Sequence, residues 1–213
     1  MKKTPLFLLA FTAISFFISC NNPEDEDIDT TTSAKTFTDV VFSRTNAYFS
    51  TTGTATQPMD SNAAKLTVST IDLTYIYNGD YSEAGFFDPI ARSQEWYWDD
   101  YYAPWLSTAK EVRYYYGSSV NLQDFNSAKA DQTLIDGFLA EMTIAPHAIF
   151  PEGSCIGGRQ SSSPTSYLLG EGYVYGFKIT PTGKSGMIYI RTDQEAAWPY
   201  WNSETKVDII VEN

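Results

Sequence analysis

The tryptophans of this chain fall in two short segments. Residues 96–105 hold three of the five and residues 198–201 hold the other two. A flat indole face can pack on the C–H face of a sugar ring, while neighbouring carboxylates accept hydrogen bonds from its hydroxyls. The pattern predicts a site for a glycan or another extracellular ligand, formed by Trp96, Trp98, Asp99, Asp100, Trp105, Trp198 and Trp201. The alternative is that these rings pack in the hydrophobic core.

Carboxylates are numerous enough to supply a hydrolytic pair. A glycosidase needs two carboxyl groups that flank one bond at a set separation. The candidates are Glu95, Asp99, Asp100, Glu171, Asp193 and Glu195. Because a sequence does not give separations, we assign no catalytic residue. An extracellular polymer hydrolase that uses paired carboxylates remains the alternative to a binding or structural protein.

One thiol and one imidazole could also form a catalytic pair. Cys155 and His147 lie eight residues apart, and an imidazole can activate a thiol as a nucleophile. No family signature surrounds them, and free cysteine is commonly a small buried apolar residue. We expect no metal site, because structural zinc needs four nitrogen or sulfur ligands and no calcium loop follows Asp99 and Asp100. We expect no cofactor.

The charge balance limits the choice of partner. The chain has 213 residues, 26 acidic and 14 basic, and a formal net charge of −12. Such an acidic surface repels phosphate backbones, so nucleic acid is not expected as a partner. Residues 37–213 have the length of one domain, and we find no internal repeat in them.

Two-residue alternation dominates this domain and predicts strands. The clearest case is residues 70–77, where Ile71, Leu73, Tyr75 and Tyr77 share one face before the Asn78–Gly79 turn signal. Further strands are expected near residues 40–42, 47–50, 111–116, 172–179, 186–191 and 207–211.

Helical spacing appears only in the middle of the domain. Leu134, Ile135, Phe138, Leu139 and Met142 recur at three- and four-residue intervals. We expect this helix to begin near residue 122 and to end at Pro146, and a second, short helix to follow Asp88–Pro89. The fold class is therefore mainly β, an antiparallel β-sandwich-like domain with a short helical insertion. The alternative is α+β, with a single antiparallel sheet and helices on one face.

The N-terminus predicts export. Lys2 and Lys3 precede an apolar run over residues 6–18, which is shorter than the ~20 residues needed to span a bilayer and matches a signal-peptide core. The run ends at Phe17-Ile18-Ser19-Cys20, which resembles the lipobox of bacterial lipoproteins. The resemblance implies cleavage before Cys20 and a diacylglycerol on its sulfur, although Phe17 stands where that family usually has Leu. The alternative is an ordinary secretory signal.

The residues after Cys20 form an acidic stretch. Residues 21–29 include five carboxylates, which repel one another and keep the segment solvated. This stretch resembles the surface-export signal of Bacteroidota-type lipoproteins, and the alternative is a plain spacer. Residues 71–79, 172–178 and 183–188 also resemble uncharacterised lipoproteins of that group. This resemblance implies a cellular location but no activity.

These expectations give one organisation for the chain. Residues 1–19 are a signal peptide, 20–36 a lipidated acidic tether, and 37–213 a single β-rich domain. We expect an outer-membrane lipoprotein, held in the membrane by the lipid on Cys20 and facing the cell exterior. Its expected role is ligand binding or envelope structure.

Overall fold

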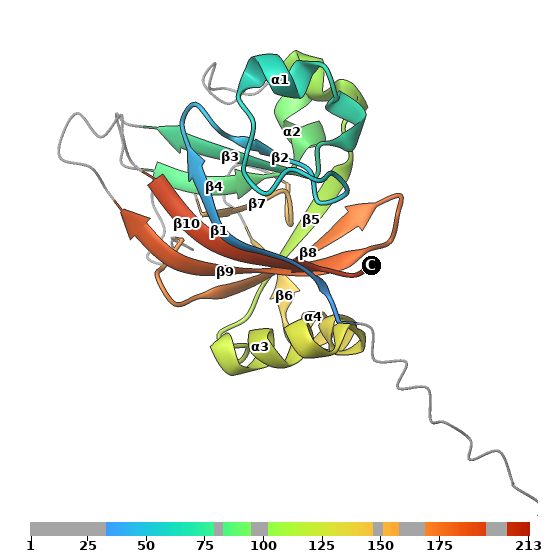
Figure 1. Ribbon diagram of the computed structural model, residues 1–213, viewed down its shortest axis with the longest axis vertical. Coiled ribbons are helices and arrows are strands. Elements are labelled where there is room, and N and C mark those ends of the chain that lie inside the picture. The colour runs from blue at the N-terminus through green and yellow to red at the C-terminus, as the bar shows by residue number, and fades with distance from the viewer. Residues whose placement is uncertain (1–32, 79–82, 95–101, 147–150, 158–168, 195–203) are drawn as a thin grey trace, which may run out of the picture. The chain divides into compact units, whose positions relative to one another are not determined.

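The computed structural model describes residues 33–78, 83–94, 102–146, 151–157, 169–194 and 204–213 (Figure 1). The strands are β1 (Lys35–Ser43), β2 (Tyr48–Phe49), β3 (Leu73–Asn78), β4 (Glu83–Phe87), β5 (Glu111–Tyr116), β6 (Thr143–Ile144), β7 (Cys155–Gly157), β8 (Val174–Thr180), β9 (Ser185–Gln194) and β10 (Glu204–Val211). The helices are α1 (Ser61–Lys65), α2 (Pro89–Ser93), α3 (Leu122–Ala130) and α4 (Ile135–Glu141), with short 3-10 turns η1 (Val68–Thr70), η3 (Pro104–Thr108) and η4 (Gln132–Leu134).

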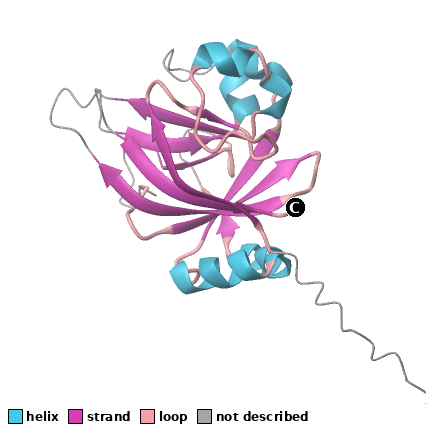
Figure 2. Ribbon diagram, in the orientation of Figure 1, coloured by secondary structure: helices cyan, strands magenta, loops and turns pink. Residues whose placement is uncertain are grey.

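The strands form two antiparallel sheets. The larger has the order β1-β10-β9-β8-β5-β6, and the smaller has the order β2-β3-β4-β7. The smaller sheet lies over one face of the larger one, and α3 and α4 lie against the opposite face (Figure 2). The expected mainly β, sandwich-like fold with a short helical insertion is confirmed. The single-sheet alternative is wrong, because a second sheet covers the first.

The core between the sheets is rich in aromatic rings. Phe42 of β1 lies at its centre, with ring centroids 4.9 Å from Phe86 and 6.0 Å from Phe49. Tyr75 of β3 packs 5.6 Å from Phe42, and its hydroxyl shares a 2.8 Å hydrogen bond with Thr205 Oγ1 of β10. These contacts join the two sheets directly.

The hairpin of β8 and β9 follows the predicted alternation. Val174 pairs with Tyr189 and Lys178 with Ser185. Residues 181–184 turn the chain, and Gly183 has a φ of 73° there, a conformation that glycine adopts at little cost. The predicted second strand of this hairpin is confirmed, and it extends further than residues 186–191.

Strand β3 is more buried than its alternation predicts. The expected inward face is buried, but so are Asp72, Thr74 and Ile76 on the other face, at 0%, 0% and 6% exposure. Polar partners satisfy that face: Thr74 Oγ1, for example, donates to the carbonyl of Phe87 at 2.7 Å. The strand is therefore covered on both sides.

The helical region contains two helices where the sequence predicts one. Asn121 caps α3 in a capping box with Asp124. The side chain of Asp131 then accepts from the N–H of Thr133 at 3.0 Å and begins η4, which separates α3 from α4. Leu134 of the predicted apolar stripe is 40% exposed, because it lies in this 3-10 turn. Helix α4 ends at Glu141, before Pro146.

Helix α4 approaches the larger sheet at a glycine. A Cβ atom on Gly176 would lie 2.9 Å from Leu139 Cδ1 and 3.0 Å from the sulfur of Met142. The missing side chain at this point of β8 lets Leu139 reach the sheet. Among the described residues, no helix has the length and apolar character needed to span a membrane.

Candidate functional site

Three segments of the chain enclose a small polar hollow. Helix α2 and its flanks, the start of β5 and residues 151–154 meet around a volume of about 300 Å³. This volume lies at the lower end of the ~300–1,000 Å³ typical of small-ligand sites. The described residues that line it are Asp88, Ile90, Ala91, Gln94, Glu111, Val112, Arg113, Pro151, Glu152, Gly153 and Ser154.

Asp88 holds these three segments together. Its carboxylate caps α2 by accepting from the N–H groups of Ala91 at 2.9 Å and Ile90 at 3.3 Å. The same carboxylate accepts from the N–H of Val112 in β5 at 2.8 Å. The N–H of Asp88 donates to the carbonyl of Ser154 at 2.7 Å. Asp88 therefore connects the three segments, through three hydrogen bonds to its carboxylate and one from its own N–H.

Residue 153 must be glycine for the wall to close. Gly153 has a φ of 80°, and a Cβ atom there would lie 2.8 Å from Cγ of Arg113. Its carbonyl accepts from the N–H of Tyr114 at 2.7 Å, and its N–H donates to the carbonyl of Ala145 at 2.8 Å. This close approach places Pro151 and Glu152 beside β5.

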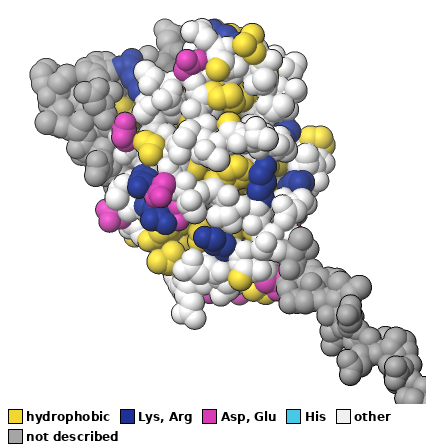
Figure 3. Space-filling model, viewed as in Figure 1, with side chains coloured by type: hydrophobic (Ala, Val, Ile, Leu, Met, Phe, Trp, Pro, Cys, Tyr) yellow, Lys and Arg dark blue, Asp and Glu magenta, His cyan; other side chains and the backbone are white. Residues whose placement is uncertain are grey.

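The hollow contains more negative than positive side chains. Asp88 is buried, while Glu111, Glu152 and Arg113 are exposed. Burial raises the pKa of Asp88 from 3.8 to about 6, although its three backbone hydrogen bonds oppose this shift, and the charge of Glu111 adds to it. Carboxylates and a guanidinium in one cavity can bind hydroxyl and amine groups. On the face shown in Figure 3, Lys and Arg side chains lie beside Asp and Glu side chains at the left, and further Lys and Arg side chains lie apart from them toward the right.

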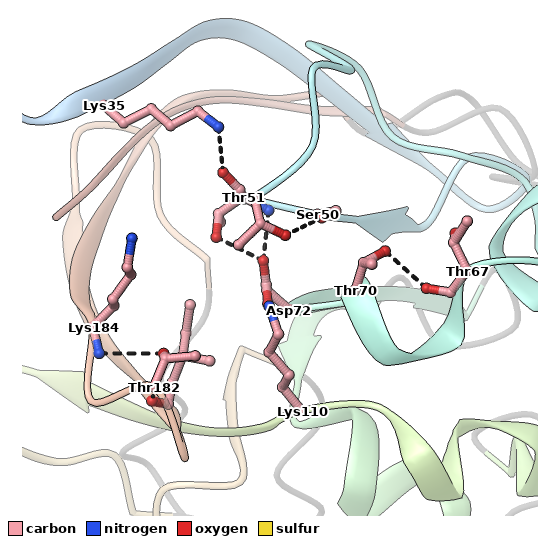
Figure 4. Close-up of polar contacts among 11 residues, drawn as sticks. Lys35, Ser50, Thr51, Thr67, Thr70, Asp72, Lys110, Thr182 and Lys184 are labelled. Carbon is pink, nitrogen blue, oxygen red and sulfur yellow. Dashed lines mark hydrogen bonds and ion pairs between the residues drawn. The ribbon is translucent and has the colours of Figure 1, made fainter. Parts of the chain in front are cut away.

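A second carboxylate is buried but serves only the protein. Asp72, fully buried, accepts from Lys110 Nζ and from both the N–H and the hydroxyl of Thr51, each at 2.6 Å (Figure 4). Lys35 Nζ in turn donates to the carbonyl of Thr51 at 2.7 Å. This network links β1 to the residues just before β3 and β5, and both carboxylate oxygens of Asp72 are engaged in it.

A second hollow, of about 400 Å³, lies beside the C-terminus. Two of its polar groups are engaged within the protein: the N–H of Asn213 donates to Gln132 Oε1, and Glu212 accepts from the N–H of Ser185, both at 2.8 Å. These contacts fasten the end of the chain, so this hollow is a weaker candidate for a ligand site.

Most of the residues predicted to form a ligand site lie outside the described residues. This holds for Trp96, Trp98, Asp99, Asp100, Trp198 and Trp201, for Cys20, and for His147, Glu95 and Glu195. Trp105 is described. It lies in η3, half-buried against the core, with its ring centroid 5.0 Å from that of Tyr48 and 5.6 Å from Lys65 Nζ.

Cys155 has the surroundings of a buried apolar residue. It lies in β7 with 1% exposure, and burial raises the pKa of its thiol well above the ordinary value. A nucleophilic cysteine needs a lowered pKa and access to solvent. The interpretation as a small core residue is therefore favoured over catalysis.

The sequence did not single out the residues that line the α2–β5 hollow. Asp88 was expected only to precede a short helix, and Glu111 and Arg113 only to lie in a strand. Glu171, a predicted carboxylate candidate, lies exposed before β8 and does not line the hollow. One sequence feature could have pointed to this hollow: the helix start at Asp88-Pro89 precedes the tryptophan-rich segment, which begins at Trp96.

Comparison with known proteins does not assign the chain to a family. No family model matches the chain, and no curated protein matches it. Among solved structures, the crystal structure of a DUF4466 family protein from Parabacteroides merdae ATCC 43184 is similar, with 12% identity and a TM-score of 0.49. The match covers 84% of this chain and 53% of that one, so this chain spans about half the length of the matched structure.

Proposed function

We propose that this protein is a surface-exposed lipoprotein of the bacterial outer membrane whose β-sandwich binds a glycan at the hollow between α2 and β5. The proposed location at the outer membrane rests on the lipobox-like Phe17-Ile18-Ser19-Cys20 and the acidic stretch after it. The binding role rests on one observation. Gln94 lines a charged hollow and is followed directly in the chain by the segment that contains Trp96, Trp98, Asp99 and Asp100.

The chemistry of the hollow suits a sugar. Glu111, Glu152 and Arg113 supply acceptors and donors for hydroxyl groups, while Ile90 and Pro151 supply apolar contact. In the sequence, Trp96 and Trp98 follow Gln94 of this lining by two and four residues. A purely structural role in the envelope would not require such a lining.

A glycan array with the full chain in detergent tests the binding role. The wild type should bind a restricted set of glycans, and Trp98→Ala and Glu111→Gln should each weaken that binding. Glu171→Gln removes a similar exposed carboxylate outside the hollow and should bind as the wild type does. Binding to no glycan, or equal binding by all four proteins, would reject the proposal.

The anchor is tested separately. Replacing Cys20 by Ala should abolish acylation and release the protein from membranes, because several buried acyl methylenes contribute about 0.8 kcal/mol each to anchoring. Mass spectrometry of the mature N-terminus provides the measurement. An unmodified N-terminus at another residue of the wild type would refute lipidation.

One observation favours hydrolysis as the second candidate function. Asp88, whose pKa is raised to about 6, and Glu111 line the same hollow, and a general acid works best with a pKa near the working pH. Against this, the Asp88 carboxylate already accepts three backbone hydrogen bonds. Release of reducing sugar from a bound glycan, lost in Glu111→Gln, would establish hydrolysis. Stable binding without release would exclude it for that glycan.

A further inference from the structure

The charges around the α2–β5 hollow come from three separate parts of the chain. Asp88 stands at the start of α2, Glu111 and Arg113 on β5, and Glu152 on the segment before β7. Among the described residues, three carboxylates and one guanidinium therefore line this cavity. Because Glu111 and Glu152 are exposed, their carboxylates are available to a ligand, whereas Asp88 adds its charge from the base.

This arrangement discriminates between ligands by charge. A ligand with a carboxylate or sulfate would meet three like charges in the hollow and a chain whose net charge is −12. An ammonium group would instead form charge-assisted hydrogen bonds, which are shorter and stronger than neutral ones. Among the apolar side chains of the lining, Ile90 is partly exposed and Pro151 is exposed, so these two can contact the C–H groups of a ring.

We infer that the hollow selects a sugar that bears a free amine over its neutral or acidic counterparts. This inference rests on the proposed glycan-binding function and names the class of ligand. The volume of about 300 Å³ suits one such ring better than a long oligomer. The ammonium lies between Glu111 and Glu152, and the ring lies against the apolar wall.

The test compares two ligands that differ only in acetylation. Oligomers of glucosamine and of N-acetylglucosamine are titrated by calorimetry against the full chain in detergent, with an oligomer of galacturonic acid as the acidic arm. The free-amine oligomer should bind at least about tenfold more tightly than the acetylated one. The acidic oligomer should not bind. Raising the salt concentration should weaken the free-amine contact.

Charge variants make the test specific to this hollow. Glu111→Gln and Glu152→Gln should each weaken binding of the free-amine oligomer about threefold to tenfold. Arg113→Gln should strengthen it by a similar factor, because it removes a cation that competes with the ligand's ammonium. Glu171→Gln, outside the hollow, should change nothing.

The outcomes separate this inference from the function on which it rests. Equal affinity for the free-amine and acetylated oligomers, preference for the acidic oligomer, or weaker binding by Arg113→Gln would overturn the amine selectivity and leave glycan binding intact. Binding to glycans of the array but not to the free-amine oligomer would have the same meaning. Binding to no glycan at all would overturn both.

Discussion

Asp88 accepts a hydrogen bond from the backbone N–H of Val112 at 2.8 Å, and this contact ties the first turn of α2 to β5. Asp88 is the N-cap residue of a helix, and Val112 lies in a strand. Because the same carboxylate also accepts from Ala91 and Ile90, the position of α2 over β5 depends on one side chain. Any change at Asp88 should therefore affect both the stability of the protein and the shape of the hollow.

Asp88→Asn should remove a pH-dependent contribution to stability. The pKa of Asp88 is about 6 in the folded protein, above its ordinary value of 3.8, because the carboxyl group is buried. Between these values the folded state holds a proton that the unfolded state has lost, so this residue's contribution is fully present below about pH 4 and is lost as pH rises through 6. The lost contribution is on the order of 3 kcal/mol. Urea unfolding of both proteins from pH 4 to pH 7.5 should show the wild type losing its advantage over the variant.

The matched control for this experiment is Asp60→Asn. Asp60 caps α1 by accepting from the N–H of Ala63 at 2.8 Å, but it is exposed. Asparagine is about as good a cap as aspartate. If both variants show the same dependence on pH relative to the wild type, the effect belongs to cap substitution in general and not to the burial of Asp88.

Lys110→Met should be strongly destabilising. Lys110 donates to Asp72, whose side chain is fully buried. Removing the cation leaves a buried carboxylate with only the two Thr51 donors, and breaking such a pair costs about 3–5 kcal/mol. Lys178→Met is the control, because its 3.6 Å ion pair with Asp136 is exposed on both sides and should contribute less than about 1 kcal/mol. Similar unfolding midpoints for the two variants would contradict the assignment of Asp72–Lys110 as a buried structural pair.

Two glycines should respond to alanine in opposite directions. A Cβ atom on Gly186 would lie 2.6 Å from the carbonyl oxygen of Ile210 and would also collide with the ring of Phe177. Since backbone cannot move aside cheaply, Gly186→Ala should destabilise by about 1–3 kcal/mol or more. Gly137 in α4 has no atom within 4 Å of its Cβ position, so Gly137→Ala should stabilise by about 0.5–1 kcal/mol. Thermal unfolding of the two variants checks both signs, and a stabilised Gly186→Ala would show that β9 is packed less closely than described.

Local rules predicted the regular parts of the fold well. The β8–β9 hairpin follows from alternation and a turn-forming sequence at residues 181–184, both of which act over a few residues. The burial of the second face of β3 was not predicted, because alternation identifies only the apolar face of a strand. The burial of Thr74 and Asp72 results from elements that are distant in sequence and cover the other face. The split of the helix at Asp131 was missed because a central aspartate can cap a new turn as well as sit in a helix.

The candidate site was less predictable, because its parts are joined only by tertiary contacts. The short helix after Asp88–Pro89 is a local signal and was found, whereas the other contacts of Asp88 were not predicted. Its contacts with Val112 and Ser154 bridge 24 and 66 residues, and no periodicity reports such distances. The sequence contains many carboxylates, and their types alone do not show which ones share a site. Glu111 and Glu152 line one hollow because Gly153 lets its segment approach β5 closely.

The acidic stretch near the N-terminus yields the last prediction. Glu24, Asp25, Glu26 and Asp27 follow Cys20 closely, and if they direct export to the cell surface, their loss should retain the lipoprotein inside the envelope. Replacing all four by Gln or Asn keeps the length and polarity of the segment and removes only its charge. External protease should then degrade the wild type on intact cells and spare the variant, while mass spectrometry finds lipid on Cys20 in both. A second variant that moves four acidic residues beyond residue 30 restores the net charge but not its position, and it should also be spared. Equal digestion of all three proteins would show that the acids serve only as a solvated spacer.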